Sequence, residues 1–478
     1  MTSVCSGFSQ NEGLILVIDQ GTSGTRVLVV DKHGAIRASA YRSISLRRYG
    51  ECLVEQDAEE IISSMHDLLR SVLADSAVQR FGVTSAGLAT QRSSVVAWDR
   101  RTGKSLAPVL SWQDVRTRHW LESFKPHAEE IRQRTGLVLS PHYGASKLRW
   151  YLDHVPEVHR SRSSGHLAFG PLTSFVLFHL LQDQPLLVDH ANASRTQLMN
   201  IAELDWDPWL LDLFGVPPES LPHCRPICQK YGRLRVAAIP VTAVNGDQNA
   251  AIFSLGRLHP DTAIVNIGTG AFILMSTGAR MMRHSVLLTS LASSSEAQND
   301  YTIEGTVNGA GAALAWASSQ WNLANITSHL ATWLSRKCDP PVFINTIGGL
   351  GSPWWKSDQA PTLLGDGDSW QKAVAVAESI VFMLHANVEV LLESGLVVNR
   401  LQVSGGLAQL NGLCQRLADL TMRPVYRPAE TEATARGIAW LAAGRPCRWI
   451  KPGRGRVFRP QENHGLLERY QRFRQVLG

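Results

Sequence analysis

Short apolar runs separated by glycine-rich turns recur along the chain. Leu14 to Ile18 and Arg26 to Val30 read as two buried strands joined by a polar turn. The same pattern returns about 250 residues later, where Thr262 to Ile267 and Phe272 to Met275 flank a second glycine-rich turn. We therefore expect two similar halves, each with its own β-hairpin.

Helical spacing of apolar residues appears between and after these hairpins. It predicts helices over 58–73, 373–393 and 409–420, and the strand-like segments are 82–88, 94–98 and 401–403. Strands that alternate with helices indicate an α/β fold with mostly parallel sheets.

Composition excludes several classes of protein. Of the 478 residues, 44% are hydrophobic and only 18% are charged, which is typical of a globular chain and not of a disordered one or a coiled coil. Seven scattered cysteines, including the close pair Cys224 and Cys228, indicate reduced thiols and a cytoplasmic protein. The apolar stretch 167–181 is too short and too interrupted to span a membrane, and the polar N-terminus has no signal-peptide pattern.

Asp19 to Thr25 forms the first candidate phosphate loop. Its glycines let backbone N–H groups approach phosphate oxygens, Thr22 and Ser23 add hydroxyl donors, and Arg26 adds charge. Asp19 stands at the end of a strand, where a carboxylate suits Mg²⁺. The alternative is an ordinary polar hairpin.

Two further glycine turns could serve a nucleotide. Gly268-Thr269-Gly270 is a second phosphate-sized hairpin, and Ser404-Gly405-Gly406 leaves room for a flat ligand such as an adenosine. Each could also be a plain turn. Three such loops at strand ends favour a nucleotide site.

Asp247 is the candidate general base. It lies in the segment 244–250, just before the second half begins, where a carboxylate can take a proton from a hydroxyl. The alternative is a helix cap for 248–254.

The order of these motifs resembles the FGGY family of carbohydrate kinases, most closely its glycerol kinases. The resemblance rests on Asp19-Gln20-Gly21-Thr22, Gln91-Arg92, Trp98-Asp99, Ser111-Trp112-Gln113-Asp114 with Arg116-Thr117, Asn192 to Thr196, Leu204 to Asp207, Gly246-Asp247-Gln248, Gly268 to Phe272, Glu304-Gly305, Ala310 to Ala312 and Gly405-Gly406. It is collinear over nearly the whole chain.

This resemblance implies two actin-like ATPase domains with ribonuclease-H-like cores and an active-site cleft between them. Residues 1–250 would form the N-terminal domain and 251–478 the nucleotide-binding domain. The residues implied to bind nucleotide are Thr22, Ser23, Arg26, Gly268, Thr269, Gly311, Gly405 and Gly406. Asp247 is implied as the base, and Asp19 and Asp247 as ligands of Mg²⁺ beside ATP.

The acceptor positions depart from the glycerol kinases of the family. Ser93 stands where they have a glutamate, and His142 stands where they have a tyrosine, whereas the family residues Arg92, Trp112, Asp247, Gln248 and Phe272 are kept. A serine is shorter and neutral, and an unpaired acceptor hydroxyl costs about 1–3 kcal/mol. We expect a small polyol or ketose, either glycerol or one somewhat larger.

The net charge of +6 suggests at first a nucleic-acid or membrane partner. Nine basic and two acidic residues lie between Gly444 and the C-terminus, so the surplus belongs to the C-terminal segment. That segment resembles the strand and helix that close the family fold, and we expect a solvated basic face with no nucleic acid and no membrane.

A small polyol or sugar is then the expected partner, with a homo-oligomer (dimer or tetramer) as a family expectation. Two alternatives remain: a nucleotide-gated binding protein of the actin or chaperone type, and a degenerate kinase without polyol phosphorylation. The aromatic acceptor residues argue against the first, and Ser93 with the altered segment after Trp355 motivates the second.

Overall fold

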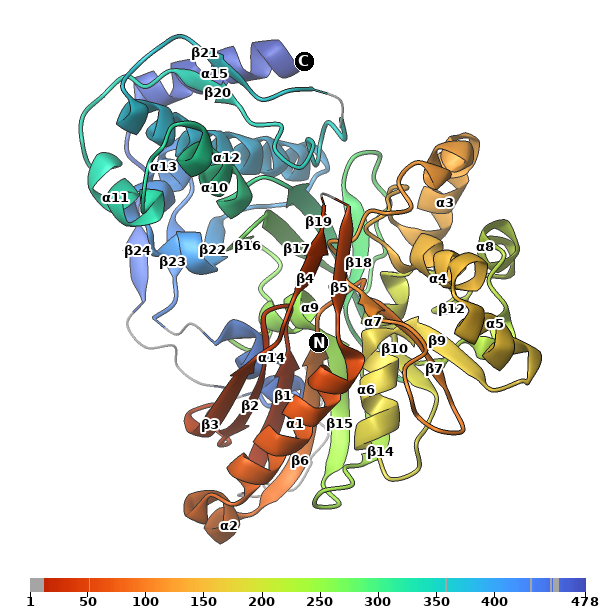
Figure 1. Ribbon diagram of the computed structural model, residues 1–478. Coiled ribbons are helices and arrows are strands. Elements are labelled where there is room, and N and C mark those ends of the chain that lie inside the picture. The colour runs from red at the N-terminus through yellow and green to blue at the C-terminus, as the bar shows by residue number, and fades with distance from the viewer. Residues whose placement is uncertain (1–12, 51, 357–358, 430–431, 448, 450–454) are drawn as a thin grey trace.

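The computed structural model describes residues 13–50, 52–356, 359–429, 432–447, 449 and 455–478. Its chain forms two α/β halves, red to green and green to blue in Figure 1, each built on one large mixed sheet. The predicted α/β class is therefore confirmed. The prediction of mostly parallel sheets is wrong, because hairpin connections make most neighbouring strands of both large sheets antiparallel.

The first sheet has the strand order β14-β15-β6-β1-β2-β3. Its strands are β1 (Leu14–Gln20), β2 (Gly24–Val30), β3 (Ile36–Ser43), β6 (Val83–Thr90), β14 (Cys228–Arg233) and β15 (Pro240–Gly246). Strand β6 runs parallel to both β1 and β15, so the carboxyl ends of these three strands meet at one edge. Helix α1 (Ala58–Leu73) packs its apolar face against β2 and β3.

The second sheet has the order β18-β19-β17-β16-β22-β23-β24. Its strands are β16 (Thr262–Ile267), β17 (Ala271–Gly278), β18 (Leu288–Ser294), β19 (Asn299–Val307), β22 (Arg400–Ser404), β23 (Val425–Arg427) and β24 (Arg456–Phe458). Helices α10 (Gly311–Gln320), α12 (Ser369–Glu393) and α13 (Asn411–Thr421) supply the core of this half. Among the described residues only α12 has the length and apolarity of a membrane span, and most of it is buried in this core.

A five-stranded sheet, β4-β5-β8-β7-β9, is attached to the first half. It consists of β4 (Arg47–Tyr49), β5 (Leu53–Gln56), β7 (Val95–Asp99), β8 (Val109–Leu110) and β9 (Leu167–Pro171), with helices α3 (Ala128–Thr135), α4 (Gly144–His154), α6 (Leu172–Leu180) and α7 (His190–Ser194) in the same region. The remaining elements are α2 (Ser76–Phe81), α5 (Pro156–Ser163), β10 (Leu187–Asp189), β11 (Met199–Asn200), β12 (Asp205–Trp206), α8 (Pro208–Phe214), β13 (His223–Arg225), α11 (Ile326–Trp333), β20 (Val342–Ile344), β21 (Thr362–Leu364) and 3₁₀ turns at 120–127, 218–220 and 406–409.

Helix α14 (Ala433–Ala442) follows the second sheet's β23 in sequence but packs on the first sheet. It contacts β1, β6, β15 and the short helix α9 (Asp247–Ala251). The approach is close at Gly437, where a Cβ would lie 1.7 Å from the carbonyl oxygen of Ala250. The domain boundary at residue 250 stays a prediction.

The predicted helices and strands lie close to the observed ones. Helix α1 spans the predicted 58–73. Helix α12 begins four residues before the predicted 373, because Asp368 and Gln371 form a capping box there. Helix α13 begins two residues after the predicted 409, because 406–409 forms a 3₁₀ turn.

The C-terminal segment closes the second half, as its resemblance implied. Strand β24 pairs with β23, and helix α15 (His464–Leu477) buries Phe473 against Phe382. The expectation of a solvated basic face is wrong for Arg469, which is buried and holds Glu378 of α12 through two hydrogen bonds of 2.8 and 2.9 Å. A carboxylate as buried as Glu378 needs a cation, and Arg469 supplies it. Arg448, Lys451 and Arg454 of the basic segment lie outside the described residues.

Candidate active site

Two carboxylates meet at the edge where β1, β6 and β15 end. Asp19 is the penultimate residue of β1, and Asp247 directly follows β15. Burial raises the pKa of Asp19 to about 7, and the charge of Asp247 contributes to the rise. Burial also raises the pKa of Asp247, against the opposing effect of Arg92. Asp19 therefore lies in the electrostatic field of Asp247, in a place that favours a cation.

Mg²⁺ fits this pair of acidic groups. It prefers oxygen ligands and is usually held by one or two carboxylates together with substrate phosphates, because it keeps several of its waters. Within the described part of the chain, no group of three or more His, Cys, Asp or Glu could hold a metal on its own. A site of two carboxylates that shares its ion with phosphates agrees with both facts.

Asp247 lies at the first position of α9, and Gly246 is the N-cap residue. The helix is shorter than the one that the capping alternative predicts, although the Asp247 carboxylate does accept a 2.7 Å hydrogen bond from the N–H of Gln248. That bond holds the carboxylate at the helix start and leaves its other oxygen for a further partner.

The first glycine hairpin turns tightly between β1 and β2. The N–H of Gly21 donates to the carbonyl of Gly24 at 2.9 Å, and the hydroxyl of Thr22 accepts a 2.8 Å bond from the indole N–H of Trp112. Ser23 is exposed. Arg26 has a half-exposed side chain that forms a 2.5 Å ion pair with Glu432 at the start of α14, and its contact with a phosphate stays a prediction.

The predicted nucleotide loops surround one pocket of about 450 Å³ in the second half. Its lining residues are Gly268, Thr269, Gly311, Ala312, Ala315, Thr327, Gly406 and Leu407. The N–H of Gly311 donates to the carbonyl of Gly268 at 2.9 Å, so the start of α10 abuts the second hairpin. The structure thus brings together Gly268, Thr269, Gly311 and Gly406, which lie up to 138 residues apart in sequence.

Gly405 precedes the pocket wall and fixes the turn that leads into it. Its φ is +93°, and a Cβ there would lie 2.6 Å from the carbonyl oxygen of Ile267. Only glycine adopts this conformation without strain.

A buried ion network surrounds Arg92, one of the predicted acceptor residues. The guanidinium of Arg92 donates to the side-chain oxygens of Gln248 and Asn249, the latter at 2.9 Å, and lies 3.6 Å from Glu304. The same Glu304 carboxylate accepts from Arg195. Burial lowers the pKa of Arg92 to about 10, and Arg195 adds to the lowering. Glu304 comes from β19, so this network joins the two halves.

Aromatic residues line the other side. The rings of Trp112 and His142 meet edge to face with centroids 5.4 Å apart, and both side chains are half-buried. Burial lowers the pKa of His142 well below its ordinary value, and the cations Lys147 and Arg195 lower it further. A neutral imidazole can both donate and accept a hydrogen bond. Phe272 lies on β17 and is half-buried.

Ser93 takes an unusual conformation. Its φ is +63°, and its hydroxyl is buried without a hydrogen-bond partner. It supplies no carboxylate beside Arg92, as the sequence predicted.

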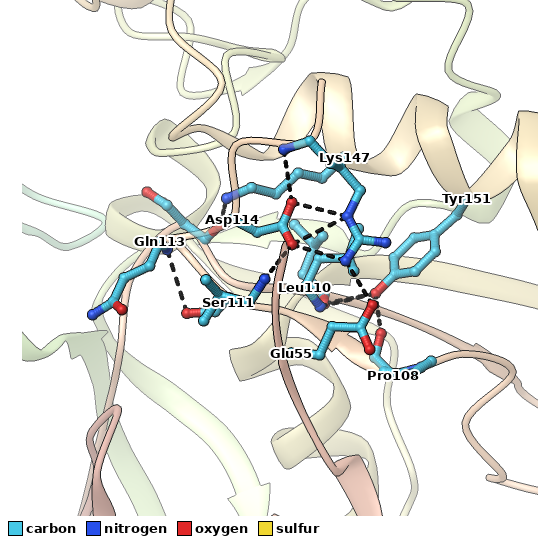
Figure 2. Close-up of polar contacts among 12 residues, drawn as sticks. Glu55, Pro108, Leu110, Ser111, Gln113, Asp114, Lys147 and Tyr151 are labelled. Carbon is cyan, nitrogen blue, oxygen red and sulfur yellow. Dashed lines mark hydrogen bonds and ion pairs between the residues drawn. The ribbon is translucent and has the colours of Figure 1, made fainter. Parts of the chain in front are cut away.

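The loop that carries Trp112 is fixed by a polar network. Asp114 accepts a 2.7 Å bond from the N–H of Val54 and binds the Arg116 guanidinium, which also reaches Glu55 at 2.6 Å. Figure 2 shows Asp114 at the centre of this network, with Glu55 and Lys147 beside it.

Sequence reasoning missed part of the site. Arg195 and Glu304 stand in the recognised motifs but received no role, and Lys147 was not considered. Lys147 falls on the same helix face as Leu148, Tyr151 and Leu152, and a charged residue at a position of this apolar period is the signal that could have marked it.

Comparison with known proteins covers most of the chain. Residues 14–254 match the N-terminal domain of the FGGY family of carbohydrate kinases, and residues 263–444 match its C-terminal domain. A glycerol kinase of Trichodesmium erythraeum is 34% identical over 95% of both chains. Among solved structures, Plasmodium falciparum glycerol kinase with ADP superposes with a TM-score of 0.86 at 23% identity, over 97% of both chains. A xylulose kinase from Brucella ovis gives 0.85 at 20% identity, over 97% of this chain and 98% of that one.

The two structural likenesses establish the two-domain fold, and the sequence matches establish the descent. The chain belongs to the FGGY family of carbohydrate kinases.

Proposed function

We propose that this chain transfers the γ-phosphate of ATP to a hydroxyl of a small, uncharged polyol or sugar, with Asp247 as the general base. The observation that carries the proposal is the position of Asp247. Asp247 follows Gly246, whose register partner Thr90 in β6 also pairs with Gln20, the residue after Asp19. It precedes Gln248 and Asn249, whose side chains accept hydrogen bonds from Arg92. Asp247 therefore has as neighbours Asp19, which would hold Mg²⁺, and the ion network of Arg92.

The chemistry needs little more than positioning and charge stabilisation. Asp247 would accept the proton of the attacking hydroxyl, held in place by the 2.7 Å hydrogen bond that its carboxylate accepts from the N–H of Gln248. Asp19 and Asp247 would hold Mg²⁺, which neutralises charge on the phosphates when it is bound. Gly268 and Thr269 would contact the phosphates, with the hairpin of Thr22, Ser23 and Arg26 opposite.

The charges around the acceptor favour an uncharged substrate. Arg92 and Arg195 are balanced by Glu304 and Asp247. Near Trp112, Arg116 and Lys147 are balanced by Glu55 and Asp114. A carboxylate on the substrate would add an unmatched charge to this buried site.

Ser93 and His142 make glycerol only one of the candidate acceptors. The site offers the small Ser93 and a neutral imidazole, so a polyol or ketose somewhat longer than glycerol also suits it. Glycerol itself is the substrate by which the Trichodesmium erythraeum relative is named.

A substrate panel tests the proposal. ADP formation from ATP and Mg²⁺ is measured with glycerol, erythritol, xylitol and common ketoses, and with glycerate and erythronate as charged counterparts. We expect turnover that depends on an added neutral acceptor and is weak with its acid. Turnover without any acceptor would favour the nucleotide-gated binding protein, and no turnover at all would favour the degenerate kinase.

The cellular location, the partners, the domain boundary and the oligomeric state are also proposals. We place the protein in the cytoplasm, with no nucleic-acid or membrane partner, and with a domain boundary near residue 250. Size measurement in solution would test the dimer or tetramer.

A further inference from the structure

Lys147 is a fully buried lysine behind the acceptor site. It lies on α4, and none of its surface is exposed. Its ammonium donates to the carbonyl of His142 at 2.8 Å and to the carbonyl of Ser93 at 3.3 Å. Among the described residues, no acidic side chain lies within ion-pair distance of it. Figure 2 shows it beside Asp114, whose charge favours its protonated form.

The two carbonyls belong to segments that are far apart in sequence and both carry acceptor residues. Ser93 follows Arg92, and its φ of +63° is one that non-glycine residues rarely adopt. His142 contacts the Trp112 ring. One ammonium therefore ties the backbone next to Arg92 to the backbone of His142.

Helix α4 is itself anchored to the ion network. The N–H of Gly144 donates to the carbonyl of Arg195 at 3.4 Å, and the N–H of Ala145 donates to that of Thr196 at 2.6 Å. A lysine three residues further along the same helix thus stands at a fixed distance from Arg195. The helix connects the ion network with the Ser93 and His142 backbones.

We propose that Lys147 is a positioning residue for the acceptor, which sets the spacing between Arg92 and His142 through the carbonyls of Ser93 and His142. This inference rests on the proposed function. Burying an ammonium costs much more than burying an apolar side chain of the same length. A purely structural position would be filled at lower cost by methionine or leucine. The hydrogen bonds to the two acceptor segments are what the lysine adds.

The test compares Lys147→Met with a matched control on the same helix. Tyr151, one turn further along α4, is also fully buried and bonds the carbonyls of Pro108 and Val95 at 2.6 and 3.1 Å. Its hydroxyl also accepts a 3.1 Å bond from the N–H of Leu110, and none of these three partners belongs to the acceptor residues. Tyr151→Phe therefore measures what a lost buried hydrogen bond in this helix does to the enzyme in general.

We expect Lys147→Met to lower kcat/KM for the best acceptor about 10- to 100-fold, as a small misplacement of a substrate does. The KM for ATP stays unchanged, because the nucleotide pocket lies in the other half. Tyr151→Phe leaves both constants unchanged. Lys147→Gln, whose amide can still donate to one carbonyl, gives an intermediate loss.

The proposal is overturned if Lys147→Met keeps the wild-type acceptor kcat/KM, or if the constants for acceptor and ATP change together. It is also overturned if neither Lys147 variant gives a cooperative thermal unfolding transition, since the role would then be stability. A wild-type enzyme that turns over no acceptor in the panel refutes the proposed function instead, so the two failures are distinguishable.

Discussion

The nucleotide pocket and the acceptor site are built by different means. The nucleotide pocket is lined mainly by glycines, alanines and backbone groups of loops that follow strands, with Gly268, Gly311 and Gly406 at its wall. The acceptor site is built from buried charged and aromatic side chains such as Arg92, Glu304 and Trp112. A site made of backbone depends on the conformation of single residues, whereas a site made of side chains depends on contacts between distant segments.

Asp247, where the two regions meet, gives the largest expected effect. Asp247→Asn keeps the shape of the side chain and removes the base, so we expect kcat to fall about 100- to 10,000-fold. The fall should appear with every acceptor that the wild type uses, in steady-state assays of ADP formation. Asp247 would also hold Mg²⁺, so the dependence of the rate on Mg²⁺ concentration is measured for Asp247→Asn and, in parallel, for Asp19→Asn. An Asp247→Asn enzyme as active as the parent would remove Asp247 from the base role.

Glu304→Gln tests the acceptor side alone. Burial opposes ionisation of Glu304, but Arg195 and Arg92 together lower its pKa. Removing this charge leaves two buried guanidiniums without their partner, which costs about 3–5 kcal/mol of stability. We expect a lower denaturant midpoint and a raised acceptor KM, with the KM for ATP unchanged.

An exposed ion pair provides the matched control for Glu304. Glu157 binds Arg160 at 2.6 Å on the surface, with both side chains at least half exposed. Exposed pairs contribute little because water screens them. Glu157→Gln should leave stability and both KM values unchanged, and an equal effect of the two substitutions would contradict the importance of the buried network.

Gly405→Ala tests the nucleotide side alone. A Cβ at φ +93° would be strained and would also press on the Ile267 carbonyl at 2.6 Å. Strain of about 1–3 kcal/mol in the loop corresponds to a roughly 5- to 150-fold rise in the KM for ATP. The acceptor KM should stay at the wild-type value.

Gly395→Ala is the control that distinguishes backbone strain in general from strain at the nucleotide pocket. The φ of Gly395 is +78°, but nothing lies within 4 Å of a Cβ there, and it is not among the residues that line the pocket. Gly395→Ala introduces backbone strain in the same half and should leave the KM for ATP unchanged. If both glycine variants raised that KM, the effect would be a general loss of stability.

The same difference explains what the sequence could predict. The nucleotide loops could be located because a site made of backbone leaves a local record of glycines after strands, as at Gly268 and Gly405. Helix α1 and the hairpin strands could be located because burial imposes a local apolar period. In both cases the residues that form the structural feature are also the residues whose sequence pattern predicts it.

The contacts of the acceptor network could not be predicted from a local sequence pattern. Arg195 meets Glu304 across 109 residues of sequence, and Lys147 reaches Ser93 across 54. The sequence also did not indicate that α14 packs on the first sheet. The apolar face of a helix shows that the helix is buried, but it does not show which sheet it packs against. The ion pair of Arg26 with Glu432 depends on this packing of α14, so the sequence did not indicate it either.

The smallest expected effect concerns the titration of Lys147. Burial lowers its pKa from 10.5 to about 7, while Asp114 raises it and Arg116 lowers it. In the unfolded chain the lysine keeps its ordinary pKa, so between these two values the unfolded state binds more protons than the folded state. The contribution of Lys147 to the free energy of unfolding therefore rises with pH between about 7 and 10.5. Below about pH 7 this contribution does not change with pH.

Lys147→Met removes this contribution, so the difference in Tm between variant and wild type should change with pH. The variant should be most favoured relative to the wild type near and below pH 7, and it should lose that advantage steadily as the pH approaches 9. Losing the bonds to Ser93 and His142 lowers the Tm of the variant equally at every pH, so the slope isolates the charge. Tyr151→Phe serves again as the control, because burial raises the pKa of Tyr151 far above this range and its Tm curve should run parallel to that of the wild type. Parallel curves for Lys147→Met and wild type would mean that Lys147 keeps its ordinary charge in the fold. The ammonium would then be stabilised by Asp114 and the two carbonyls strongly enough to offset its burial, and the acceptor site would rest on a permanently charged support.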